Sequence, residues 1–215
     1  MIIKHLNACP VDVLVFEPNA SIKEILQKED VKKDAKLTSA RAQLMYALFA
    51  YESFGEYSSL FAANKLAYFL QRMGQPLKLQ FQPKNYGPFA LGVGKVLYSM
   101  NGVYLKGLEQ QEAKPFESLN LNYEKWYEVK EYAEKHMTFD EKNRLDNLIK
   151  LITGFTSELS LEILSTTAFI LDNNPNFNIE QIMEAINQWS DRKGRLFKEE
   201  YIRVAYNHLL EYQNL

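Results

Sequence analysis

The stretch SSLFAANKLAYFLQRMG at residues 58–74 decides the fold of this chain. Its large apolar residues Leu66, Phe69, Leu70 and Met73 fall at positions i, i+3, i+4 and i+7, which is one face of an α-helix. The two serines that open the stretch can cap a helix, and the glycine that closes it can end one. The stretch therefore predicts a helix with one face in a core.

The same signals recur along most of the chain. Thr138 to Glu141 has the spacing of a capping box, and residues 161–171 are apolar on most sides, as in a central buried helix. Asn178 can cap a further helix. We therefore expect a mainly α fold, with helices over residues 38–54, 58–74, 89–101, 123–136, 138–155, 161–171, from 178 onward and around 202–209.

A small β element is expected within this helical domain. Leu77, Leu79 and Phe81 alternate with polar residues, which is the pattern of a half-buried strand. Residues 83–88 read as a turn, and residues 103–105 can pair with the strand before it. The sequence thus predicts one two-stranded sheet.

The front of the chain differs from the rest. Residues 11–16 form a β-branched apolar run that ends at Glu17-Pro18, which predicts a buried strand without neighbouring strands. Half of residues 19–36 are charged, and a short helix is expected after Ser21. We predict three parts: a C-terminal remnant of another domain at 1–18, a charged linker at 19–36 and the helical domain at 37–215.

Charge and composition restrict the classes of function. The 215 residues contain 25 Lys and Arg against 27 Asp and Glu, a net charge of −2, which is unusual for a general polyanion binder. Residues 37–108 carry seven bases and two acids, whereas residues 109–146 carry ten acids and six bases. The apolar runs are too short to cross a bilayer, so we expect a cytoplasmic protein without membrane contact.

Motifs for catalysis, metals or cofactors are missing from the sequence. It has no phosphate-binding glycine loop, and His5, His136 and His208 are too far apart for a local metal site. Cys9 has no neighbour in sequence that would activate its thiol. We therefore expect no catalytic residue, no metal and no cofactor.

Two clusters stand out as candidate partner-binding surfaces. The first runs from residue 65 to the Tyr-Gly-Pro turn at 86–88, and its polar-tipped members are Lys65, Tyr68, Gln71 and Tyr86. The second is an expected loop between two helices, with Arg192, Lys193 and Arg195, and such a loop can bind phosphate or carboxylate. A rigid turn on a core helix and a solvated loop are the alternatives.

These blocks together resemble the C-terminal domain of the DarG antitoxins of DarT/DarG toxin–antitoxin systems. The resemblance rests on Leu-Thr-x-x-Arg-Ala at 37–42, Lys-Leu-Ala-Tyr-Phe-Leu-Gln at 65–71, Tyr-Gly-Pro-Phe at 86–89 and Trp-x-x-Arg-Lys-x-x-x-Phe at 189–197. The middle block is also similar to Panacea-type antitoxin domains. Residues 11–18 resemble the last strand of the macrodomain that begins DarG proteins.

The resemblance implies a function. The family's macrodomain removes ADP-ribose from thymine bases in single-stranded DNA, and its ligand loops and catalytic lysine have no counterpart in this sequence. The chain itself would be a non-enzymatic domain that neutralises a DarT-like toxin by direct binding. We expect that toxin as the partner, and no direct binding of nucleic acid.

A toxin that reads single-stranded DNA needs a basic channel with stacking surfaces, which an acidic, aromatic segment could fill as a DNA mimic. The candidates in the acidic segment are Glu124, Trp126, Tyr127, Glu128 and Glu131. Two alternatives remain. Residues 37–108 could form a winged-helix-like nucleic-acid-binding module, and the helices could enclose the pocket of an uncharacterised hydrolase.

Overall fold

A computed structural model describes residues 34–108 and 114–212, and over these residues the fold is mainly α, as expected. The strand expected at 11–16, the helix expected after Ser21 and nearly all of the linker at 19–36 lie outside the described residues. The three-part division therefore stays a prediction. The helices are α3 (Ser39–Glu52), α4 (Leu60–Arg72), α5 (Leu91–Met100), η1 (Tyr123–Lys125), α6 (Trp126–His136), α7 (Phe139–Ile152), α8 (Glu158–Asn173), α9 (Ile179–Trp189), α10 (Asp191–Leu196) and α11 (Glu199–Glu211).

The helix ends follow the capping residues. The Ser59 hydroxyl accepts the N–H of Ala62 at 3.1 Å at the start of α4, and Gly74 follows the end of that helix with a φ of +90°. Thr138 and Glu141 form a complete capping box at the start of α7. These local signals confirm the expected ends of α4 and the expected start of α7, because they satisfy backbone groups that the helix leaves unpaired. Helix α7 ends at Ile152, earlier than the expected residue 155, and α8 begins at Glu158, before the expected residue 161.

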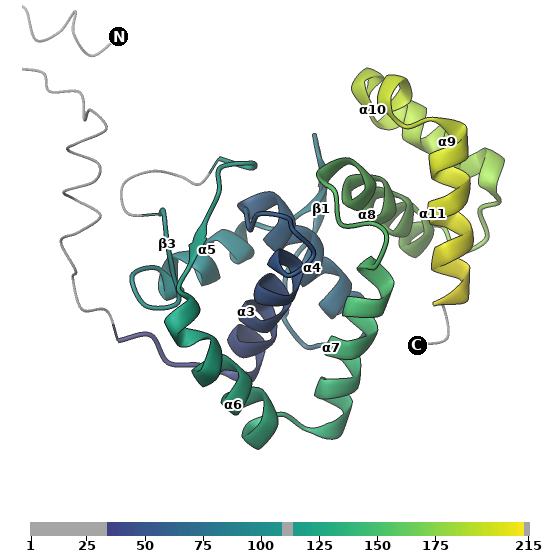
Figure 1. Cartoon of the computed structure of the whole chain (residues 1–215). Helices are drawn as coiled ribbons and strands as arrows, with labels where there is room; N and C mark the ends of the chain where they lie inside the picture. The colour runs from purple at the N-terminus through teal and green to yellow at the C-terminus, as the bar shows by residue number, and fades with distance from the viewer. Residues whose placement is uncertain (1–33, 109–113, 213–215) are drawn as a thin grey trace, which may run out of the picture. The chain divides into compact units, whose positions relative to one another are not determined.

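Helices α3, α4 and α8 carry the core. Helix α4 packs against α3, α5, α7 and α8, and α11 lies along α8 (Figure 1). Leu161, Leu164 and Ala168 of α8 are fully buried, which confirms that this helix is central. Among the described residues, no helix is long and apolar enough to cross a membrane.

The strand expected at residues 77–81 is absent. Lys78 has a φ of +56°, which an extended strand does not allow. The side-chain amide of Gln71 accepts the N–H of Leu79 at 2.8 Å and donates to its carbonyl at 2.9 Å. One side chain thus supplies both hydrogen bonds that a neighbouring strand would have made.

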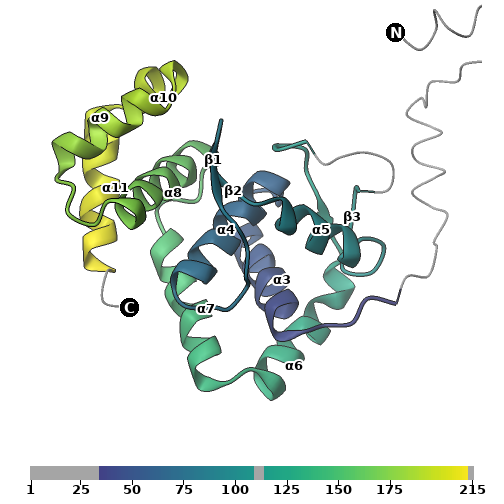
Figure 2. The same ribbon diagram turned by 180° about the vertical axis from the view of Figure 1, so that it is seen from behind.

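The strand pairing also differs from the expectation. The residues expected as a turn form a hairpin of β1 (Gln82–Lys84) and β2 (Gly87–Phe89), with Pro83 opposite Pro88, next to α4 and α8 (Figure 2). A second pair joins β3 (Leu105–Lys106) to β4 (Asn120–Leu121), so residues 103–105 do not pair with residues 77–81. The described residues therefore contain two two-stranded sheets instead of one.

The basic loop expected after Trp189 is a helix. Residues 191–196 form α10, and the Ser190 hydroxyl caps it by accepting the N–H of Lys193 at 3.3 Å. The short helix turns two consecutive basic side chains toward α8, where they meet a buried acid.

Candidate functional site

A buried carboxylate lies where α8, α10 and the hairpin meet. Glu162 of α8 is only 2% exposed. Arg192 donates to both of its oxygens, at 2.7 and 3.1 Å, and Lys193 donates to Oε1 at 2.5 Å. We call Glu162, Arg192 and Lys193, together with Lys65, the buried charge cluster. A buried carboxylate held by two cations is a structural anchor.

Lys65 brings a third cation to this cluster from α4. Its ammonium donates to the carbonyl of Pro88 at 2.8 Å and lies 5.1 Å from the centre of the Phe61 ring. Burial, followed by repulsion from Lys193, holds the pKa of Lys65 well below its ordinary value, although Glu162 opposes the shift. Burial likewise lowers the pKa of Lys193. The cluster thus joins α4, α8, α10 and the hairpin through charges that are costly to bury.

Gly87 lets the hairpin approach this cluster. Its φ is +91°, and a Cβ added there would lie 2.8 Å from the Thr166 hydroxyl oxygen and 3.2 Å from the Lys65 ammonium nitrogen. The Arg192 guanidinium also lies 4.9 Å from the centre of the Tyr86 ring. A glycine at position 87 is therefore needed for this close approach of backbone to buried side chains.

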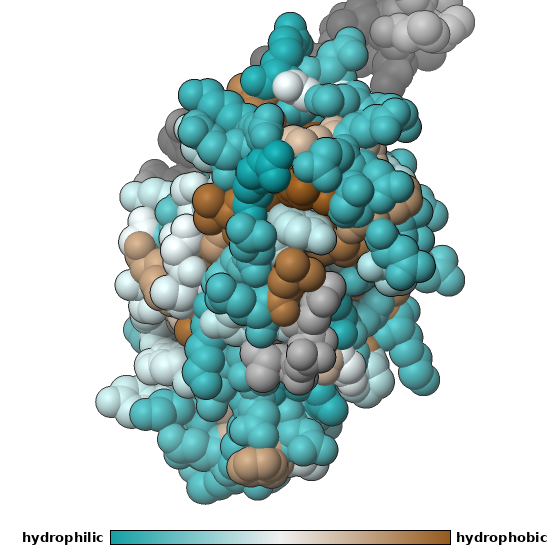
Figure 3. Space-filling view, turned by 90° about the vertical axis from the view of Figure 1, so that its right-hand side faces the viewer, coloured by the Kyte–Doolittle hydropathy of each residue, from teal (hydrophilic) through white to brown (hydrophobic). Residues whose placement is uncertain are grey.

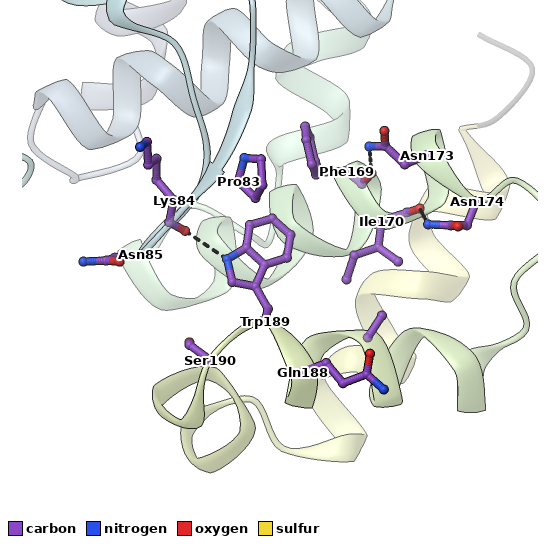
Figure 4. A pocket seen from close by; sticks show the side chains of 11 residues that line it. Pro83, Lys84, Asn85, Phe169, Ile170, Asn173, Asn174, Gln188, Trp189 and Ser190 are labelled. Atoms are coloured by element: carbon purple, nitrogen blue, oxygen red, sulfur yellow. Dashed lines mark hydrogen bonds between the residues drawn. The ribbon is translucent and has the colours of Figure 1, made fainter.

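A cleft of about 550 Å³ opens beside the cluster. Trp189 occupies its centre, and its indole N–H donates to the carbonyl of Lys84 at 3.0 Å (Figure 4). The walls come from the hairpin, the end of α8 and the end of α9. The lining residues are Pro83, Lys84, Asn85, Phe169, Ile170, Asn173, Asn174, Ala185, Gln188, Trp189 and Ser190. We call this space the Trp189 cleft.

The structure brings four of the expected partner-binding residues together, though not on an open surface. Lys65 and Lys193 are buried and Tyr86 is half-buried, so for these residues the expectation of an exposed surface is wrong. Arg192 is partly exposed and lies over Tyr86. Arg195 is exposed at the far end of α10.

Tyr68 and Gln71 belong to other contacts. The Tyr68 hydroxyl is buried and donates to Asp172 at 2.5 Å, and Arg72 pairs with the same carboxylate at 2.8 Å. Burial and the Asp172 charge raise the pKa of Tyr68 well above its ordinary value. Gln71 fixes Leu79, as described above. Both side chains therefore support the fold instead of presenting a surface.

The acidic candidates are spread over η1 and α6. Glu124 and Tyr127 are exposed, whereas the Trp126 ring packs 5.0 Å from that of Tyr46. Glu128 and Glu131 line a second cleft of about 530 Å³. Lys125 pairs with Glu128 at 2.7 Å and Lys135 pairs with Glu131. These two acids are thus paired with cations on their own helix or its entry turn, which weakens the resemblance to a strand of phosphates.

The outer side of the C-terminal helices offers no continuous apolar surface. Leu196, Val204 and Leu210 are 43%, 59% and 40% exposed. Figure 3 turns this side toward the viewer and shows hydrophobic side chains interspersed with hydrophilic ones. Scattered apolar residues of this kind are ordinary on a protein surface.

Sequence reasoning missed Glu162 as the centre of the cluster. Glu158 lies four residues before it, an ordinary spacing for two acids on a helix surface, so this spacing does not mark Glu162 as buried. The signal that points to burial is the helix itself, because residues 161–171 are apolar on most sides and leave little room for a solvated face. Among the described residues, no group of His, Cys, Asp or Glu side chains could hold a metal ion.

The chain is similar to proteins that bear the name of an enzyme. The chain is 29% identical over 204 residues to a DNA ADP-ribosyl glycohydrolase from Thermus aquaticus, covering 94% of this chain and 54% of that protein. Proteins of the same name from Mycobacterium bovis and Mycobacterium tuberculosis are 23% identical over 212 residues, covering 93% of this chain and 59% of theirs. The chain thus spans somewhat more than half the length of these relatives. No family model matches it.

These relatives correct the functional expectations. The chain was expected to be a DarG toxin-binding domain that acts as a DNA mimic without enzyme function, with a winged-helix nucleic-acid module as the alternative. That interpretation is wrong, because relatives that match almost the whole chain bear the name of an enzyme. The resemblance implied the same activity, but assigned it to a macrodomain that was expected to lie outside this sequence.

Proposed function

We propose that this chain functions in the removal of ADP-ribose from DNA, as part of a DNA ADP-ribosyl glycohydrolase. The observation that carries this proposal is the match of 94% and 93% of the chain to proteins of that name from three bacterial sources. In the proposed reaction, water adds across the glycosidic bond between ribose C1 and the DNA. Its hydroxyl goes to the ribose and its proton goes to the DNA.

The described residues support a role in holding the substrate. The Glu162 carboxylate is buried and occupied by Arg192 and Lys193, so it is not available to activate water. The Trp189 cleft, in contrast, is open and combines an aromatic ring with amide side chains and a lysine. Such a lining suits a nucleotide better than it suits proton transfer.

Location and partner belong to the same proposal. We place the protein in the cytoplasm because the proposed substrate is DNA. A DarT-like toxin remains a predicted partner, and binding to it is a separate question from hydrolysis.

The proposed function is tested with a single-stranded oligonucleotide that bears one ADP-ribosyl group. The full chain is added, the oligonucleotide is resolved on a denaturing gel, and free ADP-ribose is measured by chromatography. We expect the oligonucleotide to return to the mobility of the unmodified strand as ADP-ribose appears in equal amount. Heat-denatured chain and an ADP-ribosylated protein serve as controls. Full retention of the modified strand at high protein concentration would overturn the proposal.

A further inference from the structure

The indole of Trp189 is held in one orientation at the centre of its cleft. Its N–H donates to the Lys84 carbonyl at 3.0 Å, and Phe169 meets the ring edge-on at 5.7 Å between centroids. The Lys193 ammonium lies 5.4 Å from the ring centre. Figure 4 shows the ring among the cleft residues, with its N–H directed to the hairpin. A ring fixed by three contacts loses little freedom when a flat ligand stacks on it.

Two asparagines at the end of α8 line the same cleft, and their side-chain nitrogens are used within that helix. Asn173 donates its side-chain N–H to the Phe169 carbonyl at 2.7 Å, and Asn174 donates to the Ile170 carbonyl at 3.1 Å. Their side-chain carbonyl oxygens have no hydrogen-bond partner in the described part of the chain. Nucleobases carry N–H donors on their edges that such oxygens can accept.

The charge of the cleft favours an anion at its rim. Lys84 is exposed on the hairpin, and its ammonium forms no ion pair with any residue that the structure describes. Within those residues the lining includes no carboxylate, so nothing in the wall repels a phosphate. A lysine at the rim of an aromatic cleft can pair with the phosphate of a nucleotide whose base stacks within the cleft.

We propose that the Trp189 cleft binds an unpaired nucleobase, stacked on the Trp189 ring with its phosphate at Lys84. The cleft volume of about 550 Å³ lies within the range of small-molecule sites and can hold a nucleotide. This inference rests on the proposed function, which supplies two sources of such a base: the single-stranded DNA and the adenine of ADP-ribose.

Intrinsic fluorescence gives a direct test, because the chain has only two tryptophans. Trp126 packs on Tyr46 and Phe49 and does not line the cleft, so Trp126→Phe leaves Trp189 as the single indole. We expect an unmodified oligothymidine or free ADP-ribose to quench the remaining fluorescence, and the probe that does so at lower concentration identifies the source of the base.

Substitutions test the same contacts through affinity. Trp189→Ala should weaken binding of the quenching probe about ten-fold, and Trp189→Phe, which retains a ring, should weaken it less. If the oligonucleotide is the ligand, Lys84→Ala should also lower the slope of log affinity against log salt by about 0.7. Lys95→Ala, an exposed lysine on α5, is the matched control and should leave affinity and slope unchanged. Circular dichroism checks that each variant is folded.

The outcomes separate this inference from the proposed function. Because the Trp189 variants lack the reporter indole, their affinity is measured by calorimetry. Weaker binding of the quenching probe to Trp189→Ala in that assay supports the nucleobase site even if the chain releases no ADP-ribose. Absence of quenching by both probes at millimolar concentration, or calorimetric binding that neither Lys84→Ala nor Trp189→Ala alters, overturns the site. If the chain releases ADP-ribose but neither probe quenches Trp189, the proposed function is supported and the nucleobase site is overturned.

Discussion

The two terminal guanidinium nitrogens of Arg192 donate to the two oxygens of the Glu162 carboxylate, at 2.7 and 3.1 Å. This pairing joins residues 30 positions apart and fixes α10 against α8. Because only Ser190 separates Trp189 from α10, the same ion pair fixes the wall of the Trp189 cleft. The buried charge cluster is therefore the support of the candidate site.

Replacement of Glu162 tests how much this support contributes. Glu162→Ala leaves Lys193 buried without its carboxylate, and loss of one partner of a buried ion pair costs about 3–5 kcal/mol. Glu158→Ala is the matched control, because Glu158 is an exposed glutamate one turn earlier on α8. Urea unfolding should show a large decrease in the free energy of unfolding for Glu162→Ala and a decrease of less than about 1 kcal/mol for Glu158→Ala. Equal losses would contradict the structural role of the cluster.

Gly87 gives a second test of the same packing. Gly87→Ala forces a side chain into a positive φ and places its Cβ 2.8 Å from the Thr166 hydroxyl oxygen. Gly55→Ala has the same backbone strain, with a φ of +89°, but no atom within 4 Å of the added Cβ. We expect the free energy of unfolding to fall by about 1 kcal/mol in Gly55→Ala and by clearly more in Gly87→Ala. Thermal unfolding of both variants measures the difference, and matching losses would show that the hairpin can move away.

Local signals in the sequence were sufficient for most of the helices. Ser59 and Thr138 cap helices in the expected places, because capping depends on residues within one turn. The prediction of a strand at 77–81 was wrong because it depends on a hydrogen-bond partner outside the segment. Its alternating pattern is compatible with extended backbone, but the partner is the side chain of Gln71, which no pattern of apolar residues reveals.

Only part of the candidate site could be predicted from the sequence. Lys65, Tyr86, Arg192 and Lys193 were identified as unusual, and they do meet in space. Their role was not predictable, because it depends on Glu162, which comes from a different helix 30 residues before Arg192. The Trp189 cleft depends on a hairpin about 105 residues away, through the bond from the indole N–H to Lys84. Such long-range contacts follow from the fold and not from local sequence.

The lowered pKa of Lys65 predicts how stability depends on pH. Burial, and then the nearby Lys193 charge, holds the folded-state pKa below the ordinary value of 10.5. Between these two values the unfolded chain binds more protons than the folded one, so the free energy of unfolding rises as pH rises. Lys65→Met should lack this contribution, and its stability curve from pH 7 to pH 10 should be flatter than that of the wild type. Urea unfolding at several pH values measures the slopes, and parallel curves would contradict a lowered pKa.

Gln71 should control the order of the segment before the hairpin. Gln71→Ala removes the two hydrogen bonds to the backbone of Leu79, each worth about 0.5–1.5 kcal/mol, so we expect a loss of about 1–3 kcal/mol. Gln82→Ala, an exposed glutamine on β1, is the control and should cost less than about 0.5 kcal/mol. Hydrogen exchange gives the local readout, because the Leu79 N–H loses its acceptor and should exchange faster than in the wild type. Unchanged protection of Leu79 in Gln71→Ala would mean that another group holds this segment against α4.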